Sequence, residues 1–337
     1  MLLVDAQKNP IKIYDVDEVF EINIPENISV YDMFSTNKNN RYIALAPQKT
    51  IYVYDRETKQ LITAPFKLKP AFHSLRFDEN DQLYFISGNA VSRWKIESEK
   101  EEELFVMKRA THGPSDLGVS PSGKYVSFLK YRSDSNYLYI LDTTTGECVD
   151  TKISVYHYAW TDETHIAFTK SGGLKILEVT TGKSKTVVKD HTALAKKCPK
   201  DNAAILERYV ANKDHFITYD LDLLDIYENK IWFSFYITDH DEDIMARDPE
   251  TNELTKNHIC HHAVWNVNLD GTSPRLCYEV PADYWSAILK TGAGWKYFVN
   301  GCYLWNKDNS LHVFDGKDHY STEGELRPVV LYKNRCR

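Results

Sequence analysis

A histidine-rich stretch near residue 260 is the part of the sequence best equipped to do chemistry. The segment NHICHH, residues 257–262, holds three histidines and a cysteine, and the segment DHDED, residues 239–243, lies a short distance upstream. Imidazole, thiolate and carboxylate groups bind zinc and similar divalent metals, and histidine also titrates near neutral pH. The stretch could therefore be a metal site, a catalytic cluster, a pH-sensitive contact or a polar turn.

The metal hypothesis depends on how the two segments are placed by the strands around them. On an uninterrupted strand alternate side chains share a face, so three potential ligands of NHICHH would point the same way. A residue of DHDED on a partner strand would complete a tetrahedral set, although the spacing matches no standard zinc motif. The candidate ligands are Asp239, His240, His258, Cys260 and His262. The alternative is a polar β-hairpin without any cofactor, which is the expectation here.

Composition and charge narrow the class of protein. The 337-residue chain has 42% hydrophobic residues and a net charge of −7, which is typical of a folded domain and unfavourable for nucleic-acid binding. The apolar run Ile231–Ile237 is far too short to cross a bilayer. The N-terminus carries no signal-peptide pattern, so a cytoplasmic protein without membrane insertion is expected, and export by a non-classical route would fit equally. No nucleophile elbow or complete phosphate loop is present, which favours a protein that is not an enzyme.

An internal repeat is the strongest signal of fold. Short alternating strands separated by turn residues recur along the chain, and Ile43, Tyr84, Val126 and Ile166 occupy equivalent places in successive second strands. The steps between them are 41, 42 and 40 residues. Turn segments such as TTGE and TTGK have the composition of hairpin loops. The pattern predicts an all-β chain of consecutive four-stranded units.

Two further copies place the rest of the chain in the same scheme. Trp232 and Tyr297 continue the series after steps of 66 and 65 residues, so each step contains one period and an insertion. The distance from Tyr297 through the C-terminus to Ile43 is 83 residues, or two periods. We therefore predict a single seven-bladed β-propeller over residues 1–337, with six blades as the alternative. Its last blade would combine the C-terminal segment 327–333 with N-terminal strands, which closes the ring.

Part of the repeat resembles a known family. The segment VSPSGKYVSFLKYRSDSNYLYILDTTTGE, residues 119–147, is similar to the WD40-like repeat of TolB-type and prolyl-oligopeptidase-type propellers, and YAWTDETHIAF with LKILEVTTGK resembles it more weakly. The resemblance implies a propeller. The Gly-His and Trp-Asp dipeptides of true WD40 repeats are absent, and no hydrolase motif accompanies the repeats. The resemblance therefore implies no peptidase activity.

The two insertions suggest where such a propeller would work. They cover about residues 189–219, with a short helix expected at 201–212, and about residues 239–261. The first joins two blades and the second joins the second and third strands of the fifth blade, so both should lie on one face of the ring. Long loops on a rigid scaffold commonly carry function.

We therefore expect a binding scaffold that recognises a protein or peptide partner through the face that carries the insertions. The candidate contact residues are Tyr209, His240, His258 and His261. The alternative is an enzyme or a glycan- or small-molecule-binding propeller that uses the central channel, with a metal such as zinc at the fifth-blade hairpin.

Overall fold

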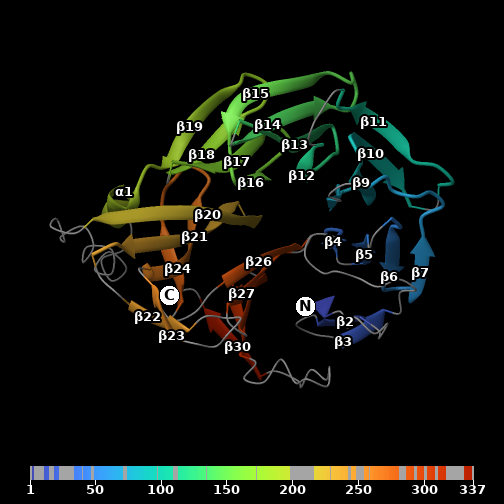
Figure 1. Cartoon of the computed structure of the whole chain (residues 1–337). Coiled ribbons are helices and arrows are strands. Elements are labelled where there is room, and N and C mark those ends of the chain that lie inside the picture. Colours follow the sequence, from blue (N-terminus) through green and yellow to red (C-terminus); the bar gives the residue numbers. More distant parts are fainter. Residues whose placement is uncertain are drawn as a thin grey trace. The chain divides into compact units, whose positions relative to one another are not determined.

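The computed structural model consists almost entirely of antiparallel β-sheets (Figure 1). It describes residues 2–3, 11–14, 19–22, 34–39, 41–46, 49–70, 74–96, 98–108, 113–133, 135–171, 173–197, 216–227, 229–241, 244–247, 254–257, 259–280, 286–291, 294–299, 302–307, 310–315 and 330–335. The chain divides into two units, residues 1–154 with 291–293 and residues 155–290 with 294–337. Among the described residues, no helix is long and apolar enough to span a membrane.

The first unit contains a three-stranded sheet and three four-stranded sheets. The three-stranded sheet is made of β1 (Leu2–Leu3), β2 (Ile11–Tyr14) and β3 (Val19–Ile22). The others are β4 (Phe34–Thr36), β5 (Tyr42–Leu45), β6 (Tyr52–Asp55) and β7 (Gln60–Thr63); β8 (Leu75–Phe77), β9 (Gln82–Ser87), β10 (Ala90–Lys95) and β11 (Glu102–Val106); and β12 (Ser115–Val119), β13 (Tyr125–Arg132), β14 (Ser135–Asp142) and β15 (Cys148–Ser154).

The second unit contains two four-stranded sheets, a five-stranded sheet and a separate hairpin. The four-stranded sheets are β16 (Tyr158–Trp160), β17 (His165–Lys170), β18 (Gly173–Glu178) and β19 (Lys183–Val188); and β20 (Ile217–Tyr227), β21 (Lys230–Asp239), β24 (Ile259–Asn268) and β25 (Arg275–Val280). The five-stranded sheet is β26 (Ser286–Thr291), β27 (Gly294–Val299), β28 (Cys302–Lys307), β29 (Ser310–Asp315) and β30 (Val330–Arg335). The hairpin is β22 (Ile244–Arg247) with β23 (Leu254–Asn257), and the helix α1 (His191–Lys197) precedes β20.

The sequence period corresponds to the sheets of the structure. Every reference position of the repeat lies on the second strand of its sheet. The positions are Ile43 in β5, Tyr84 in β9, Val126 in β13, Ile166 in β17, Trp232 in β21 and Tyr297 in β27. The prediction of an all-β chain of four-stranded antiparallel units is confirmed, while the number of blades and the closure of a ring stay predictions.

A recurring turn explains why the repeat is visible in the sequence. In three sheets of the first unit, a buried polar side chain precedes the second strand: Asn37, Asp78 and Ser120. Each accepts a hydrogen bond from the backbone amide at the start of that strand, with distances of 2.9, 2.9 and 3.0 Å. Because a buried amide needs a partner, a turn residue with a side-chain oxygen is required at each of these places.

The hydrophobic core of each unit lies between neighbouring sheets. In the second unit it joins β17–β19 to β20, β21 and β24, and Leu194 of α1 contributes to it. Trp265 is fully buried there, and Trp232 of β21 is also fully buried, as expected for tryptophans on strands. Burial of such large side chains stabilises each contact between sheets by several kcal/mol, about 3–5 for a tryptophan or phenylalanine relative to alanine.

Two elements differ from the sequence expectation. The C-terminal strand β30 pairs with β29 and extends that sheet to five strands, whereas it was expected to begin a seventh blade. The described helix is α1, capped by Asp190, whose carboxylate accepts a hydrogen bond from the Ala193 amide at 2.7 Å. The helix expected at 201–212 lies outside the described residues.

Candidate functional site

The strands that border the two predicted insertions end beside one another in one sheet. In the sheet of β20, β21, β24 and β25, Ile217 at the start of β20 pairs with Asp239 at the end of β21. Thr238 in turn pairs with Ile259 at the start of β24. The start of β20, the end of β21 and the start of β24 are therefore adjacent, and these strand ends border the two predicted insertions (Figure 1). The second of these segments contains the hairpin β22–β23, whose strands pair with each other from Ile244 to Asn257.

A small set of side chains ties these strand ends together. We call it the strand-end cluster, and it consists of Phe216, Thr218, Asp239, His240 and Asp241. The rings of Phe216 and His240 are stacked with centroids 4.7 Å apart, and the His240 amide donates to the Phe216 carbonyl at 3.0 Å. The Asp241 carboxylate accepts from the Phe216 amide, and the Thr218 hydroxyl lies 2.9 Å from His240 Nε2.

The cluster combines a buried carboxylate, which fixes the turn, with an exposed aromatic ring. Asp239 is buried, with 1% of its surface exposed, and its carboxylate accepts a hydrogen bond from the Asp241 amide at 3.1 Å, which holds the turn. Phe216 is 63% exposed. Single exposed hydrophobic residues are ordinary, but this ring stacks on His240, and the Phe216 backbone is held by two hydrogen bonds, to His240 and Asp241. An exposed aromatic ring with few remaining degrees of freedom is well suited to anchor a partner.

The four predicted contact residues differ in how much of each the structure describes. His240 is a member of the cluster, and its Nε2 already contacts the Thr218 hydroxyl. His261 of β24 pairs through its backbone with Ile237 of β21, and the side chain of His261 is not among the described ones. Tyr209 and His258 lie outside the described residues altogether. Phe216 was missed by sequence reasoning, although it is an aromatic residue directly before a strand at the end of an insertion.

A register shift interrupts the strand that carries part of the predicted metal set. Ile237 pairs with His261 and Thr238 with Ile259, so Cys260 is an extra residue in a β-bulge. A bulge interrupts the alternation on which a shared face for positions 258, 260 and 262 depended. The side chains of Cys260 and His262 lie outside the described ones. In the part of the chain that the structure describes, no group of three or more His, Cys, Asp or Glu side chains could hold a metal ion.

A second group of titratable residues lies beside the first strands of two neighbouring sheets, β16 and β20. Nε2 of His157, just before β16, is 3.6 Å from a carboxylate oxygen of Asp222 in β20. Burial raises the pKa of Asp222 above its usual value; His157 opposes this increase and the neighbouring Asp220 adds to it. The alternating acids of the segment DLDLLDIY, residues 220–227, are the sequence signal for this pair, since they interrupt an otherwise apolar strand.

Comparison with known proteins gives a fold and no family. No protein-family model matches the sequence, and no curated protein matches it. Among solved structures, an oligogalacturonate lyase in complex with manganese is 10% identical, with a TM-score of 0.50 over 88% of this chain and 77% of that one. A TolB protein from Agrobacterium tumefaciens is 11% identical, with a TM-score of 0.43 over 80% of this chain and 89% of that one. The N-terminal domain of Nup159 is 10% identical, with a TM-score of 0.42 over 89% of this chain and 79% of that one.

The repeated sheets and one of these likenesses define the architecture of the chain. The oligogalacturonate lyase is a β-propeller, and the repeated four-stranded sheets of this chain agree with it, so the chain has a fold of the β-propeller type. At such low identity the likeness extends to the fold alone, and one fold hosts many activities. The function must therefore be argued from the cluster itself.

Proposed function

We propose that this chain is a non-enzymatic β-propeller scaffold that binds a protein or peptide partner through the strand-end cluster and the two segments that leave it. The proposal includes a single closed ring of seven blades with both insertions on one face, and a cytoplasmic location. The observation that supports it best is the register that pairs the start of β20 with the end of β21 and the end of β21 with the start of β24. A rigid sheet that carries adjacent long segments is a common arrangement for recognition.

The chemistry of the cluster favours a peptide over a small molecule. Phe216 offers an exposed ring, His240 stacks on it, and Asp241 adds an exposed carboxylate beside them. An apolar anchor with a polar rim matches the anatomy of protein interfaces, where a few aromatic residues supply most of the affinity.

The test uses single substitutions and a random peptide library. Peptides selected on the immobilised full chain should bind Phe216→Ala and His240→Ala at least about tenfold more weakly, as expected for a loss of 1.4 kcal/mol or more at an interface anchor. Affinity is measured by calorimetry with each purified variant.

The control for this experiment is Val149→Ala, which alters a hydrophobic residue of β15 in the first unit that is 50% exposed. Its affinity for the selected peptides should equal that of the unmodified chain. If Val149→Ala weakens binding as much as Phe216→Ala does, or if neither cluster substitution weakens it, the cluster is not the contact surface.

A second candidate function is an enzyme, or a glycan- or small-molecule-binding propeller, that uses the central channel, with zinc at the fifth-blade hairpin as one version. The observation that favours it is the His157–Asp222 pair, because a carboxyl whose pKa is raised by burial and that faces a histidine suits proton transfer. Metal analysis that finds no stoichiometric zinc, copper or nickel in the purified chain would exclude the metal version.

The premise of this second candidate can be checked through stability. Because the pKa of Asp222 is raised in the folded state, the folded chain binds a proton at this carboxyl more tightly than the unfolded chain does. The ionised carboxyl therefore lowers the free energy of unfolding once the pH rises above the pKa that Asp222 has in the unfolded state. Asp222→Asn removes that cost. The free energy of unfolding of the unmodified chain should therefore fall relative to Asp222→Asn as the pH rises above 3.8, the usual carboxyl pKa. A difference that is constant with pH would show that the carboxyl is not perturbed.

A further inference from the structure

A pocket in the second unit lies apart from the strand-end cluster. It has a volume of about 300 Å³ and lies over β17, β18 and β19, with Leu269 from the β24–β25 turn as part of its wall. That turn follows Asn268, which pairs with Lys230 at the end of the sheet opposite to Asp239. The volume is at the lower end of the range for ligand pockets, about 300–1,000 Å³. The pocket is therefore large enough for a small molecule and separate from the proposed partner site.

The strand register gathers charged residues in this pocket. His165, Glu178 and Lys183 lie opposite one another on three successive strands. Ile176 and Lys185 form a second pair of opposite positions on the same face. The pocket is thus lined by Lys183, Lys185 and His165, by the apolar side chains of Ile176 and Leu269, and by the carboxylates of Asp162 and Glu178.

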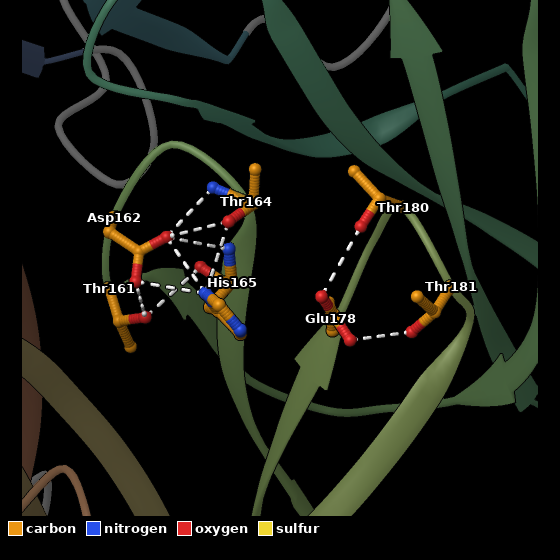
Figure 2. A network of polar contacts seen from close by, with 7 residues as sticks. All are labelled: Thr161, Asp162, Thr164, His165, Glu178, Thr180 and Thr181. Carbon is orange, nitrogen blue, oxygen red and sulfur yellow. Dashed lines mark hydrogen bonds and ion pairs between the residues drawn. The ribbon is translucent and has the colours of Figure 1, made fainter.

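The two carboxylates are occupied by donors of their own turns (Figure 2). Asp162 accepts hydrogen bonds from the Thr164 amide at 2.8 Å and from the His165 amide at 3.0 Å, and lies 2.9 Å from His165 Nδ1. Glu178 accepts from the Thr181 hydroxyl at 2.7 Å. Partial burial acts to raise the pKa of Asp162, but these hydrogen bonds outweigh it and lower the pKa below its usual value. Both groups are thus held as acceptors within the protein.

The side chains of the two lysines, unlike the two carboxylates, are not engaged by neighbouring side chains in ion pairs within the described residues. Within the described part of the chain, neither Lys183 nor Lys185 has an ion pair within 4.0 Å. Asp270, whose pKa is lowered mainly by the Thr272 hydroxyl and also by Lys185, already accepts two hydrogen bonds from Thr272. The ammonium groups of Lys183 and Lys185 are therefore the donors that remain for a ligand. Because Nδ1 of His165 is held by Asp162, Nε2 is the nitrogen of that ring available to a bound molecule.

We propose that this pocket is a binding site for a small anion in which a carboxylate or phosphate group adjoins a short aliphatic part. Lys183 and Lys185 bind the anionic group, His165 Nε2 contacts a polar substituent, and Ile176 with Leu269 contacts the methylene groups. Charge-assisted hydrogen bonds of this kind are stronger than neutral ones and give the site its preference for anions. The site does not depend on the proposed partner-binding function, because the two lie on different strand ends.

The experiment is a ligand titration of the full chain with two probes, glutarate and inorganic phosphate. Binding of either probe should weaken about tenfold or more in the double variant Lys183→Gln/Lys185→Gln, which corresponds to a loss of 1.4 kcal/mol or more. Glutarate binding without phosphate binding would indicate an organic acid, and the reverse would indicate a phosphate ligand. The matched control is Lys170→Gln, an exposed lysine at the other end of β17, which should bind as the unmodified chain does.

Three results would overturn the proposal. The first is equal binding by the double variant and the unmodified chain. The second is equal weakening by Lys170→Gln, which would indicate unspecific attraction. The third is absence of binding by both probes at millimolar concentration. Circular dichroism of each variant verifies that the substitutions at exposed lysines leave the fold intact.

Discussion

Replacing Gly271 by alanine is expected to destabilise the second unit by about 2–4 kcal/mol, the sum of a strained backbone and an overpacked contact. Gly271 has φ of +85°, a region that residues with a Cβ rarely adopt. A Cβ added there would lie 2.7 Å from the Val187 carbonyl oxygen, which is backbone and cannot rotate away. The turn that contains Gly271 packs directly on β19, so either this turn or β19 would have to move.

Gly182 provides the matched control for this prediction. It also has positive φ, +68°, but a Cβ added there meets nothing within 4 Å. Gly182→Ala should therefore cost only the backbone contribution, about 1 kcal/mol. Urea unfolding of both variants, followed by circular dichroism, measures the difference. Equal destabilisation by the two substitutions would mean that the close approach of Gly271 to Val187 is absent.

Replacing residues 242–257 by Asn-Gly is expected to abolish partner binding while the sheet stays folded. The ends of β21 and β24 are paired at Thr238 and Ile259, so a short loop can join them. The removed hairpin β22–β23 forms a sheet of its own, in which Ile244 pairs with Asn257, and the described strands show no pairing between it and its neighbours. Shortening such a surface loop changes stability by about 1 kcal/mol at most.

The readouts for the loop replacement are unfolding and capture of library peptides. The urea midpoint should stay close to that of the unmodified chain, and peptides selected on the full chain should no longer bind. A folded variant that keeps its affinity for these peptides would show that the hairpin contributes nothing to recognition.

The architecture was predictable because the signal is local and repeated. Each copy needs a polar residue such as Asn37, Asp78 or Ser120 before its second strand, so the same turn chemistry recurs at a period close to 41 residues. Alternation of apolar residues within short strands then fixes which face is buried. These requirements can be read from one sequence without knowledge of long-range contacts.

The details of the candidate site were less predictable, since they depend on pairing between distant segments. The bulge at Cys260 arises from the register of β24 on β21, which no pattern within NHICHH indicates. The contact between Phe216 and His240 joins the residue just before β20 to the residue just after β21, which are far apart in the sequence. Likewise, pairing of β30 with β29 follows from a register that the repeat count alone does not determine.

Site-specific photo-crosslinking at the strand-end cluster tests the central claim most directly. A photoreactive phenylalanine analogue at position 216 replaces one aromatic ring by another on the exposed side chain of Phe216, and the same analogue at position 149 on β15 is the control. After irradiation in a lysate of the host cell, the scaffold account predicts a discrete protein adduct from position 216 that is missing from position 149 and from the loop-replaced chain. Adducts of equal intensity from both positions, or an adduct that survives replacement of the loop, would contradict it.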